Sequence, residues 1–171
     1  MDILKTAIDW TKAEMLSSSF FILFGATFLL ASYGFWHLGK TDVARAYVIP
    51  ASVAGGLLLI IGVGIFVQSY GRVTGFAQAY EADASAFLAT EMQRAETVLR
   101  QYAIAVFRVI PMIVAACAVV LVFVDGPQWR GALVTTIAMM SVILPIGSNA
   151  NARLQVYQSA LEQATSAQDT D

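Results

Sequence analysis

Arg108 is the residue whose position most strongly suggests chemistry. It is the single charged residue in the otherwise uncharged stretch 101–124. A guanidinium keeps its proton in a protein, so at bilayer depth it needs hydrogen-bond acceptors. Arg108 therefore snorkels to lipid phosphates, joins a structural hydrogen-bond cluster, or binds an anion, a headgroup or a substrate. The candidate polar layer or anion and headgroup contact consists of Arg108, Ser19, Gln68, Ser148 and Asn149.

Three of the four prolines fall inside apolar stretches of the sequence. Pro50, Pro111 and Pro145 are candidate kinks, because proline lacks a backbone donor and crowds the carbonyl four residues earlier. Pro145 is followed closely by Gly147 and Asn149, so this segment is the strongest candidate for a local helix break. Kinks of this kind mark gates in some membrane helices and are static in many others.

Small residues recur in the stretch 46–71 and just beyond it. Small side chains let helix backbones approach closely, and close approach drives helix association in lipid. The candidate helix-packing or oligomer interface consists of Ala51, Gly55, Gly56, Gly71 and Gly75. The helix that packs on these residues belongs either to the same chain or to a second copy.

Metal and cofactor chemistry is not expected from this composition. The chain contains one histidine, His37, and one cysteine, Cys117. A zinc site needs several Cys, His or carboxylate ligands, and these two residues fall at different depths of the predicted membrane helices. We therefore predict no metal site and no cofactor.

The carboxylates also give little reason to expect an enzyme. The sequence has no Gly-rich phosphate loop, no GxSxG motif and no HExxH motif, and we predict no catalytic residue. Glu81, Asp83, Glu91 and Glu96 lie among arginines and have the pattern of a solvated helix face. No acidic residue falls inside an apolar stretch, which disfavours proton-coupled transport.

Four stretches with almost no charge must position all of these residues. They cover 15–39, 46–71, 101–124 and 131–152, and each is long enough to cross a hydrocarbon core of about 30 Å as a helix. The chain of 171 residues is 58% hydrophobic and 13% charged, which leaves no room for a separate soluble domain. The predicted fold class is all-α, a polytopic membrane protein with a four-transmembrane-helix up-down bundle.

The segments between and beyond these stretches are predicted to be helical too. Asp83 to Ser85 is the expected turn of a cytoplasmic hairpin, since both residue types favour caps, and Asp42 is the expected N-cap of the second span. Apolar stripes flank this turn and occur near both chain ends, serving packing within one chain or a partner; one is Leu88, Met92, Ala95, Leu99 and Tyr102. The single domain 1–171 divides into an amphipathic helix (1–14), four spans (15–38, 44–70, 102–124, 130–149), the hairpin (71–101), a C-terminal helix (150–165) and a disordered tail (166–171).

The distribution of lysine and arginine predicts the orientation. With a cytoplasmic N-terminus, seven of these residues lie inside and only Lys40, Arg45 and Arg130 lie outside. Both termini are therefore predicted to be cytoplasmic, in a bacterial plasma (inner) membrane. Trp10 and Tyr157 are expected in the aromatic belt at the inner face. The net charge of −2 gives no indication of a nucleic-acid partner.

These observations favour a non-enzymatic membrane protein. We expect a structural or accessory subunit that self-associates or packs in a larger membrane complex. The alternative is an oligomeric channel or facilitator for a small solute, ion or lipid, favoured by the prolines and the expected polar layer. The expected partners are the lipid bilayer and other membrane subunits, including further copies of this chain.

Overall fold

The computed structural model describes residues 3–168, and within this range the chain is helical, with short turns and no β-strand. Its order is α1 (Ile3–Leu38), α2 (Asp42–Ala46), α3 (Val48–Ala82), α4 (Ala84–Ile104), the π-helical turn η1 (Ala105–Val109), α5 (Ile110–Phe123) and α6 (Pro127–Gln168). Four helical segments are long and apolar enough to cross a membrane: Ile3–Leu38, Asp42–Ala82, Ala84–Phe123 and Pro127–Ser166.

The helices are longer than the spans that the sequence predicts. The N-terminal helix and the first span form one continuous helix, α1. The fourth span and the C-terminal helix likewise form one helix, α6, which continues to Gln168, beyond the expected end at 165. The remainder of the predicted disordered tail, 169–171, lies outside the described residues. Breaking either helix at the edge of the apolar stretch would expose backbone groups without any gain in packing.

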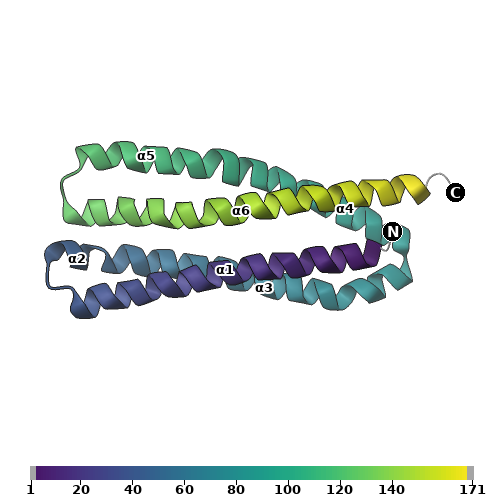
Figure 1. The fold of residues 1–171 in the computed structure, drawn as a ribbon, viewed down its shortest axis with the longest axis horizontal. Helices are drawn as coiled ribbons and strands as arrows, with labels where there is room; N and C mark the ends of the chain where they lie inside the picture. Colours follow the sequence, from purple (N-terminus) through teal and green to yellow (C-terminus); the bar gives the residue numbers. More distant parts are fainter. Residues whose placement is uncertain (1–2, 169–171) are drawn as a thin grey trace.

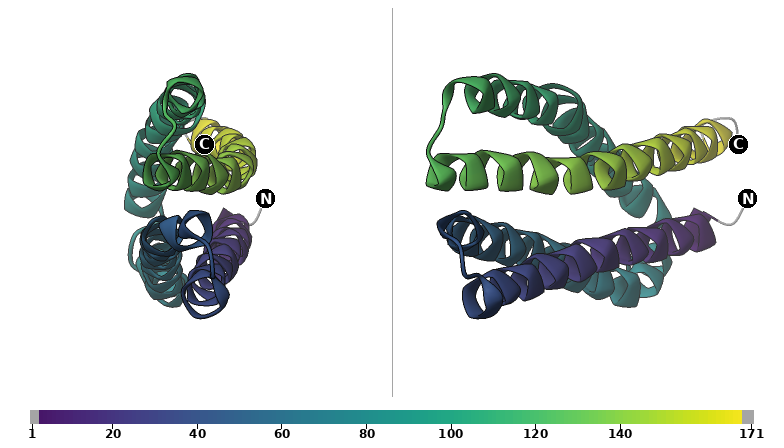
Figure 2. Two further views of the ribbon diagram at one scale, coloured as in Figure 1. Left: turned by 90° about the vertical axis from the view of Figure 1, so that its left-hand side faces the viewer. Right: turned by 60° about the vertical axis from the view of Figure 1, so that its left-hand side comes forward.

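The helices are arranged as two pairs. Figure 1 shows α1 beside α3 in the lower pair and α5 beside α6 in the upper pair, and both views in Figure 2 keep this arrangement. The helix α4 links the pairs by passing from the end of α3 across α6 to α5. The beginning of α1, the turn between α3 and α4, and the end of α6 lie at the same end of the molecule. We call this end, residues 3–14, 71–101 and 153–168, the polar end, and the rest the apolar half.

The chain reverses direction at Asp83, inside the predicted turn. Asp83 is extended, and its side-chain carboxylate accepts a hydrogen bond from the Ala86 backbone N–H at 2.9 Å, which caps α4. The expected cap at Asp42 is wrong by one residue. Thr41 is the N-cap of α2, accepting from the Ala44 N–H at 3.2 Å, and Asp42 occupies the first turn, where its charge favours the helix dipole.

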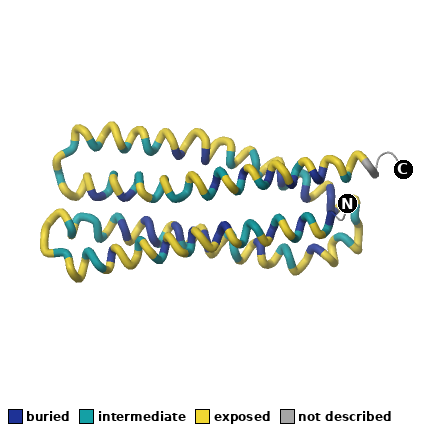
Figure 3. Tube along the Cα trace, in the orientation of Figure 1, coloured by how far each residue is buried: buried dark blue, intermediate teal, exposed yellow. Residues whose placement is uncertain are grey.

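The apolar stripes of the polar end pack together within one chain. Buried side chains from α1, α3, α4 and α6 form a single core there: Ile3, Ala7, Phe76, Phe87, Leu88, Ala95, Leu154, Tyr157 and Leu161. Water surrounds this part of the molecule if the apolar half lies in lipid, so burying these residues is driven by the hydrophobic effect. By contrast, Ile110 is the only buried residue of α5, and Figure 3 shows exposed residues along most of that helix.

Glycines set the contact between α1 and α3 in the apolar half. A Cβ atom on Gly55 would lie 2.8 Å from the carbonyl oxygen of Gly25, and one on Gly25 would lie 2.9 Å from the Leu59 backbone nitrogen. A Cβ atom on Gly62 would lie 2.9 Å from the Ile22 backbone nitrogen. Ser32 adds a hydrogen bond to the Val48 carbonyl at 2.7 Å. These helices therefore approach as closely as their backbones allow.

Two of the three candidate kinks lie next to a helix junction, and the third does not. Pro50 lies in the first turn of α3, where its missing N–H would have no helical acceptor. Pro111 follows the π-helical turn η1 directly. The break expected at Pro145 is wrong, because α6 runs through it without interruption. Continuing the helix leaves one carbonyl without a donor, whereas a break in lipid would leave several.

Candidate functional site

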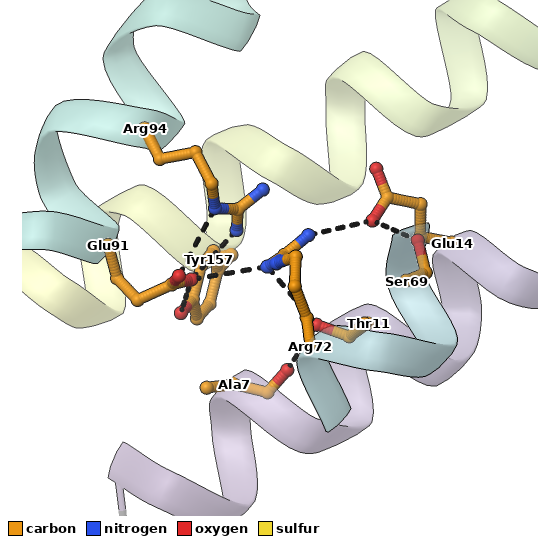
Figure 4. Close-up of polar contacts among 8 residues, drawn as sticks. All are labelled: Ala7, Thr11, Glu14, Ser69, Arg72, Glu91, Arg94 and Tyr157. Atoms are coloured by element: carbon orange, nitrogen blue, oxygen red, sulfur yellow. Dashed lines mark hydrogen bonds and ion pairs between the residues drawn. The ribbon is translucent and has the colours of Figure 1, made fainter. Parts of the chain in front are cut away.

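The most concentrated group of polar side chains lies at the polar end, where α1, α3, α4 and α6 meet. Figure 4 shows two arginines between two glutamates, together with hydroxyl groups that complete their hydrogen bonds. We call this group the polar network; its members are Thr11, Glu14, Ser69, Arg72, Glu91, Arg94 and Tyr157. No buried side-chain polar atom in residues 3–166 is left without a hydrogen-bond partner.

Arg72 of α3 is the centre of this network. Its Nη1 lies 3.2 Å from Glu14 Oε2, and its Nη2 lies 3.3 Å from Glu91 Oε2 and 3.4 Å from Thr11 Oγ1. One guanidinium therefore connects α1, α3 and α4. The rigid fork of donors in arginine suits this arrangement, because a lysine presents its donors from a single point.

Glu91 of α4 is the most buried acid of the network. Its side chain is 6% exposed, and it accepts hydrogen bonds from both Arg94 Nε, at 3.2 Å, and Arg94 Nη2, at 2.7 Å. The hydroxyl of Tyr157 donates to Glu91 Oε2 at 2.9 Å. The prediction that Glu91 belongs to a solvated face is wrong. Glu91 is buried, and its carboxylate binds Arg72, Arg94 and the Tyr157 hydroxyl in place of water molecules.

Trp10 covers the network from α1. Its ring stacks on that of Tyr157, with centroids 5.0 Å apart and planes 11° apart. The guanidinium carbons of Arg94 and Arg72 lie 4.7 Å and 5.3 Å from the Trp10 ring centroid, which places both cations within cation–π range. Trp10 and Tyr157, expected in an interfacial belt, therefore serve the interior of the polar end.

Burial changes the protonation equilibria in the network. Burial of the Arg72 guanidinium lowers its pKa, and the nearby Arg94 charge adds to this effect, while Glu91 and Glu14 oppose it. Burial raises the pKa of the Tyr157 phenol, and the charge of Glu91 and its hydrogen bond raise it further. The phenol therefore stays protonated and remains a hydrogen-bond donor at neutral pH.

A cavity of about 350 Å³ adjoins the network between the two helix pairs. Its lining comes from α1 and α3 on one side and from α4, η1, α5 and α6 on the other. Polar side chains, among them Glu14, Gln68 and Gln101, lie at the polar end of the cavity, and apolar side chains such as Phe21 and Ile61 lie at the other. The volume is within the range of small-molecule sites.

The candidate polar layer is not gathered around Arg108. Arg108 is exposed and makes no hydrogen bond or ion pair with any other residue that the structure describes. Ser19 is exposed and donates to the Met15 carbonyl at 3.0 Å, while Ser148 is half-buried and Asn149 is exposed. Of the five candidates, only Gln68 lines the cavity.

Arg153 is the arginine that contacts serine near the inner edge of the apolar half. Its Nη1 donates to the Ala13 carbonyl at 3.1 Å, and its Nη2 donates to Ser17 Oγ. The sequence offered one signal for this role, because Arg153 follows the uncharged stretch 131–152 directly. That signal indicates the depth of Arg153 along the helix but not which side of the helix its side chain faces.

The five small residues of the candidate interface divide into two groups. Ala51 and Gly55 are buried, and Gly55 contacts α1. A Cβ atom on Gly56, Gly71 or Gly75 would meet nothing within 4 Å. Gly71 and Gly75 line a groove of about 370 Å³ between α3 and α4. The first group therefore serves packing within the chain, and the second faces outward.

The remaining candidates show no ligand set in the described part of the chain. His37 is exposed and stacks on Tyr33, with ring centroids 5.7 Å apart. Cys117 is a free thiol on α5. No three His, Cys, Asp or Glu residues between 3 and 168 are placed to hold a metal ion.

The site thus combines a network whose buried polar groups are paired with a cavity that has one polar and one apolar end. The network can fix the positions of four helices, and the cavity can bind an elongated molecule. Comparisons of the chain with protein-family models, with curated proteins and with solved structures give no match in any of the three.

Proposed function

We propose that this chain is a non-enzymatic integral membrane protein, a structural or accessory subunit that packs against a second copy or another membrane protein. The observation that carries the proposal is the open groove between α3 and α4. Small residues contribute to both of its walls, Gly71, Gly75 and Ala79 on α3 and Ala86 and Thr90 on α4, and the larger Arg72, Phe76, Phe87 and Glu91 complete the lining with Asp83. Grooves of this composition admit the backbone of another helix.

The spacing of the α3 wall supports helix packing. Gly71, Gly75 and Ala79 recur every four residues, which places them on one face of the helix. A glycine in a helix destabilises it by about 0.5–1 kcal/mol relative to alanine, and nothing within the chain requires glycine at 71 or 75. A close-packed partner helix gives a physical reason for both glycines.

The placement in the membrane forms part of the same proposal. The apolar half spans the bilayer four times, and the polar end lies in the cytoplasm of a bacterial cell with both chain termini. The excess of lysine and arginine near the polar end supports this orientation. Reporter tags on the two termini are expected to respond from the cytoplasmic face, and a periplasmic signal from either tag would overturn the orientation.

Cross-linking in native membranes tests the packing proposal. Ala79→Leu and Gly75→Leu fill the groove, and each is expected to abolish cross-linked dimers or the co-purification of a partner subunit. Gly34→Leu is the matched control, because Gly34 also faces open space but lies on α1, far from the groove along the chain. Association that survives both groove variants, or is lost equally in the control, would contradict the proposal.

A facilitator for a small solute, ion or lipid is the second candidate. It is supported by the cavity between the helix pairs, which extends from the polar end into the apolar half. Purified chain in liposomes is expected to pass solute down a gradient if this candidate is right. The absence of flux under ion, solute and lipid gradients, together with a stable partner, would leave only the accessory role.

A further inference from the structure

We propose that the cavity between the helix pairs binds an acyl chain of a membrane lipid whose head carries a primary ammonium group, held at Glu14. This inference concerns a different surface from the groove between α3 and α4. Its outcome is therefore independent of whether the chain packs against a partner.

The polarity of the cavity changes along the helix axes. Near the polar end its lining includes Glu14, Gln68 and Gln101, and near the other end it includes Phe21 and Ile143. On α1 and α3 the polar lining residues Glu14 and Gln68 lie closer to the polar end than the apolar Phe21 and Ile61, and the lining residues of α6 are all apolar or glycine. A molecule with one polar and one apolar end fits this gradient in a single orientation.

The cavity is elongated in the direction of a lipid chain. On α1 its lining runs from Glu14 to Phe21, and on α6 from Ala150 to Ile143. Each run covers roughly 10 Å along the helix axis. The polar end of these runs coincides with the ends of the uncharged stretches, where lipid headgroups lie.

Glu14 supplies the charge that selects the head. Its Oε2 accepts hydrogen bonds from Ser69 and Arg72, as Figure 4 shows. Its Oε1 accepts no hydrogen bond from residues 3–166. Glu14 is the only charged residue in the cavity lining. A primary ammonium group carries three donors and a positive charge, so it can bind Oε1 directly.

Uncharged polar groups beside Glu14 complete the head site. The amides of Gln68 and Gln101 and the hydroxyl of Tyr102 line the cavity and make no hydrogen bond within residues 3–168. Arg153 lies next to them, lining a small adjoining pocket together with Glu14 and Tyr102. Its guanidinium has donors beyond the two that bind Ala13 and Ser17, which suits the phosphate of a zwitterionic head.

The wall of the cavity contains the unusual helical turn η1. In this turn the Ile110 N–H donates to the carbonyl of Ala105, five residues earlier, and Ala105 and Val106 line the cavity. Val106 is buried against Gly147, where a Cβ atom would lie 2.7 Å from Val106 Cγ2. π-Helical turns of this kind occur frequently at functional sites.

Native mass spectrometry of the full chain tests the proposal. The chain is offered equal amounts of phosphatidylethanolamine, phosphatidylcholine and phosphatidylglycerol in mixed micelles. We expect phosphatidylethanolamine to be retained about tenfold more than the other two, the factor given by a charge-assisted hydrogen bond of ordinary strength. Equal retention of the three lipids would overturn the assignment of the head.

Two neighbouring isoleucines provide a matched pair for the acyl chain. Ile61 lines the cavity and is 39% exposed, whereas Ile60 of the same helix is 71% exposed and lies outside the cavity lining. Ile61→Trp fills the cavity and is expected to reduce lipid retention to background, and Ile60→Trp is expected to leave it unchanged. If the Ile61 variant retains lipid at the native level, the acyl chain binds elsewhere, and the assignment of this cavity as the lipid site is wrong.

Glu14→Gln distinguishes recognition of the lipid headgroup from binding of the acyl chain. The glutamine amide can still accept hydrogen bonds from Ser69 and Arg72, but it carries no charge for the ammonium group. We expect this variant to retain all three lipids about equally. Preserved selectivity for phosphatidylethanolamine would exclude Glu14 as the contact of the headgroup. The Ala79→Leu variant, which fills the groove between α3 and α4, is expected to retain lipid as the native protein does.

Discussion

At the polar end, large side chains from four helices pack into one core and Arg72 connects three of these helices through ion pairs, whereas in the apolar half α1 and α3 meet through glycines. The same helices therefore associate by two different mechanisms along their length. In water, burying Phe76, Leu88 or Leu154 removes apolar surface from solvent. In lipid this driving force is absent, and close backbone approach takes its place.

The comparison explains where the molecule is open. Helix α5 lies entirely in the apolar half and approaches no other helix except α6 and the adjoining turn η1, in the part of the chain that the structure describes. It has neither a glycine that allows close approach nor a charged side chain. If the apolar half lies in a bilayer, lipid can cover α5 as well as protein does, so no hydrophobic force draws the two helix pairs together there.

Removing the most buried acid is expected to have the largest effect at the polar end. Glu91→Ala leaves Arg72 and Arg94 without their shared partner, which is expected to reduce the free energy of unfolding by about 3–5 kcal/mol. Reversible unfolding in mixed micelles measures this change. Glu96→Ala is the control, because Glu96 is exposed on the same helix. A similar loss of stability in both variants would show that the polar network does not stabilise the fold.

An added methyl group is expected to have the largest effect in the apolar half. Gly55→Ala puts a Cβ atom against the Gly25 carbonyl, so the helices must separate, at a cost of about 1–3 kcal/mol. Gly56→Ala adds the same group to open space and is expected to leave stability unchanged or slightly higher. Thermal unfolding of the two variants in one detergent compares them directly, and equal stability would show that α1 and α3 do not pack through Gly55.

A smaller effect is expected from deleting one hydroxyl of the network. Tyr157→Phe keeps the ring stacked on Trp10 and removes the hydrogen bond to Glu91, which is expected to destabilise the chain by about 1.5 kcal/mol. Glu91 keeps both arginines in this variant, so the loss should be well below that of Glu91→Ala. A loss as large as that of Glu91→Ala would mean that the hydroxyl, not the ion pairs, holds the helices.

The smallest expected effect near neutral pH is the contribution of Tyr157 ionisation. The pKa of Tyr157 is raised in the folded chain, so this contribution is complete below the unfolded value of about 10 and is lost as pH rises above it. Stability should therefore not change between about pH 7 and 9 on account of this group. Above that range the native chain should lose stability more steeply than Tyr157→Phe, and parallel curves would contradict the raised pKa.

Much of the polar end could be predicted from the sequence because its pattern is periodic. The stripes around Leu88 and Phe76 follow the helical repeat, and Asp83 is a residue type that ends helices. Glu91 could not be recognised as buried, because its neighbours in sequence are polar and its partners Arg72 and Tyr157 come from other helices. Burial of a charge is decided by tertiary contacts that local spacing does not encode.

The apolar half shows the opposite limit. Composition identified its spans, but it could not distinguish Gly55 from Gly56, since only the direction of each residue separates a tight contact from open space. Arg108 was the most conspicuous residue by type, yet the helix turns it outward, while Arg153 turns inward. When nearly every residue is apolar, no polar face remains to indicate which side of a helix packs inside.

The unbroken course of α6 gives the molecule a mechanical property. From Pro127 to Tyr157 the helix is a rod of about 45 Å, which contacts α2 near its beginning, at Gly131 and Ala46, and binds Glu91 through the Tyr157 phenol at the other end. A tilt of about 5° about the Pro127 end would displace the Tyr157 end by about 4 Å, more than a hydrogen bond tolerates. A bilayer deformation that tilts α6 in this way would therefore break the hydrogen bond between Tyr157 and Glu91.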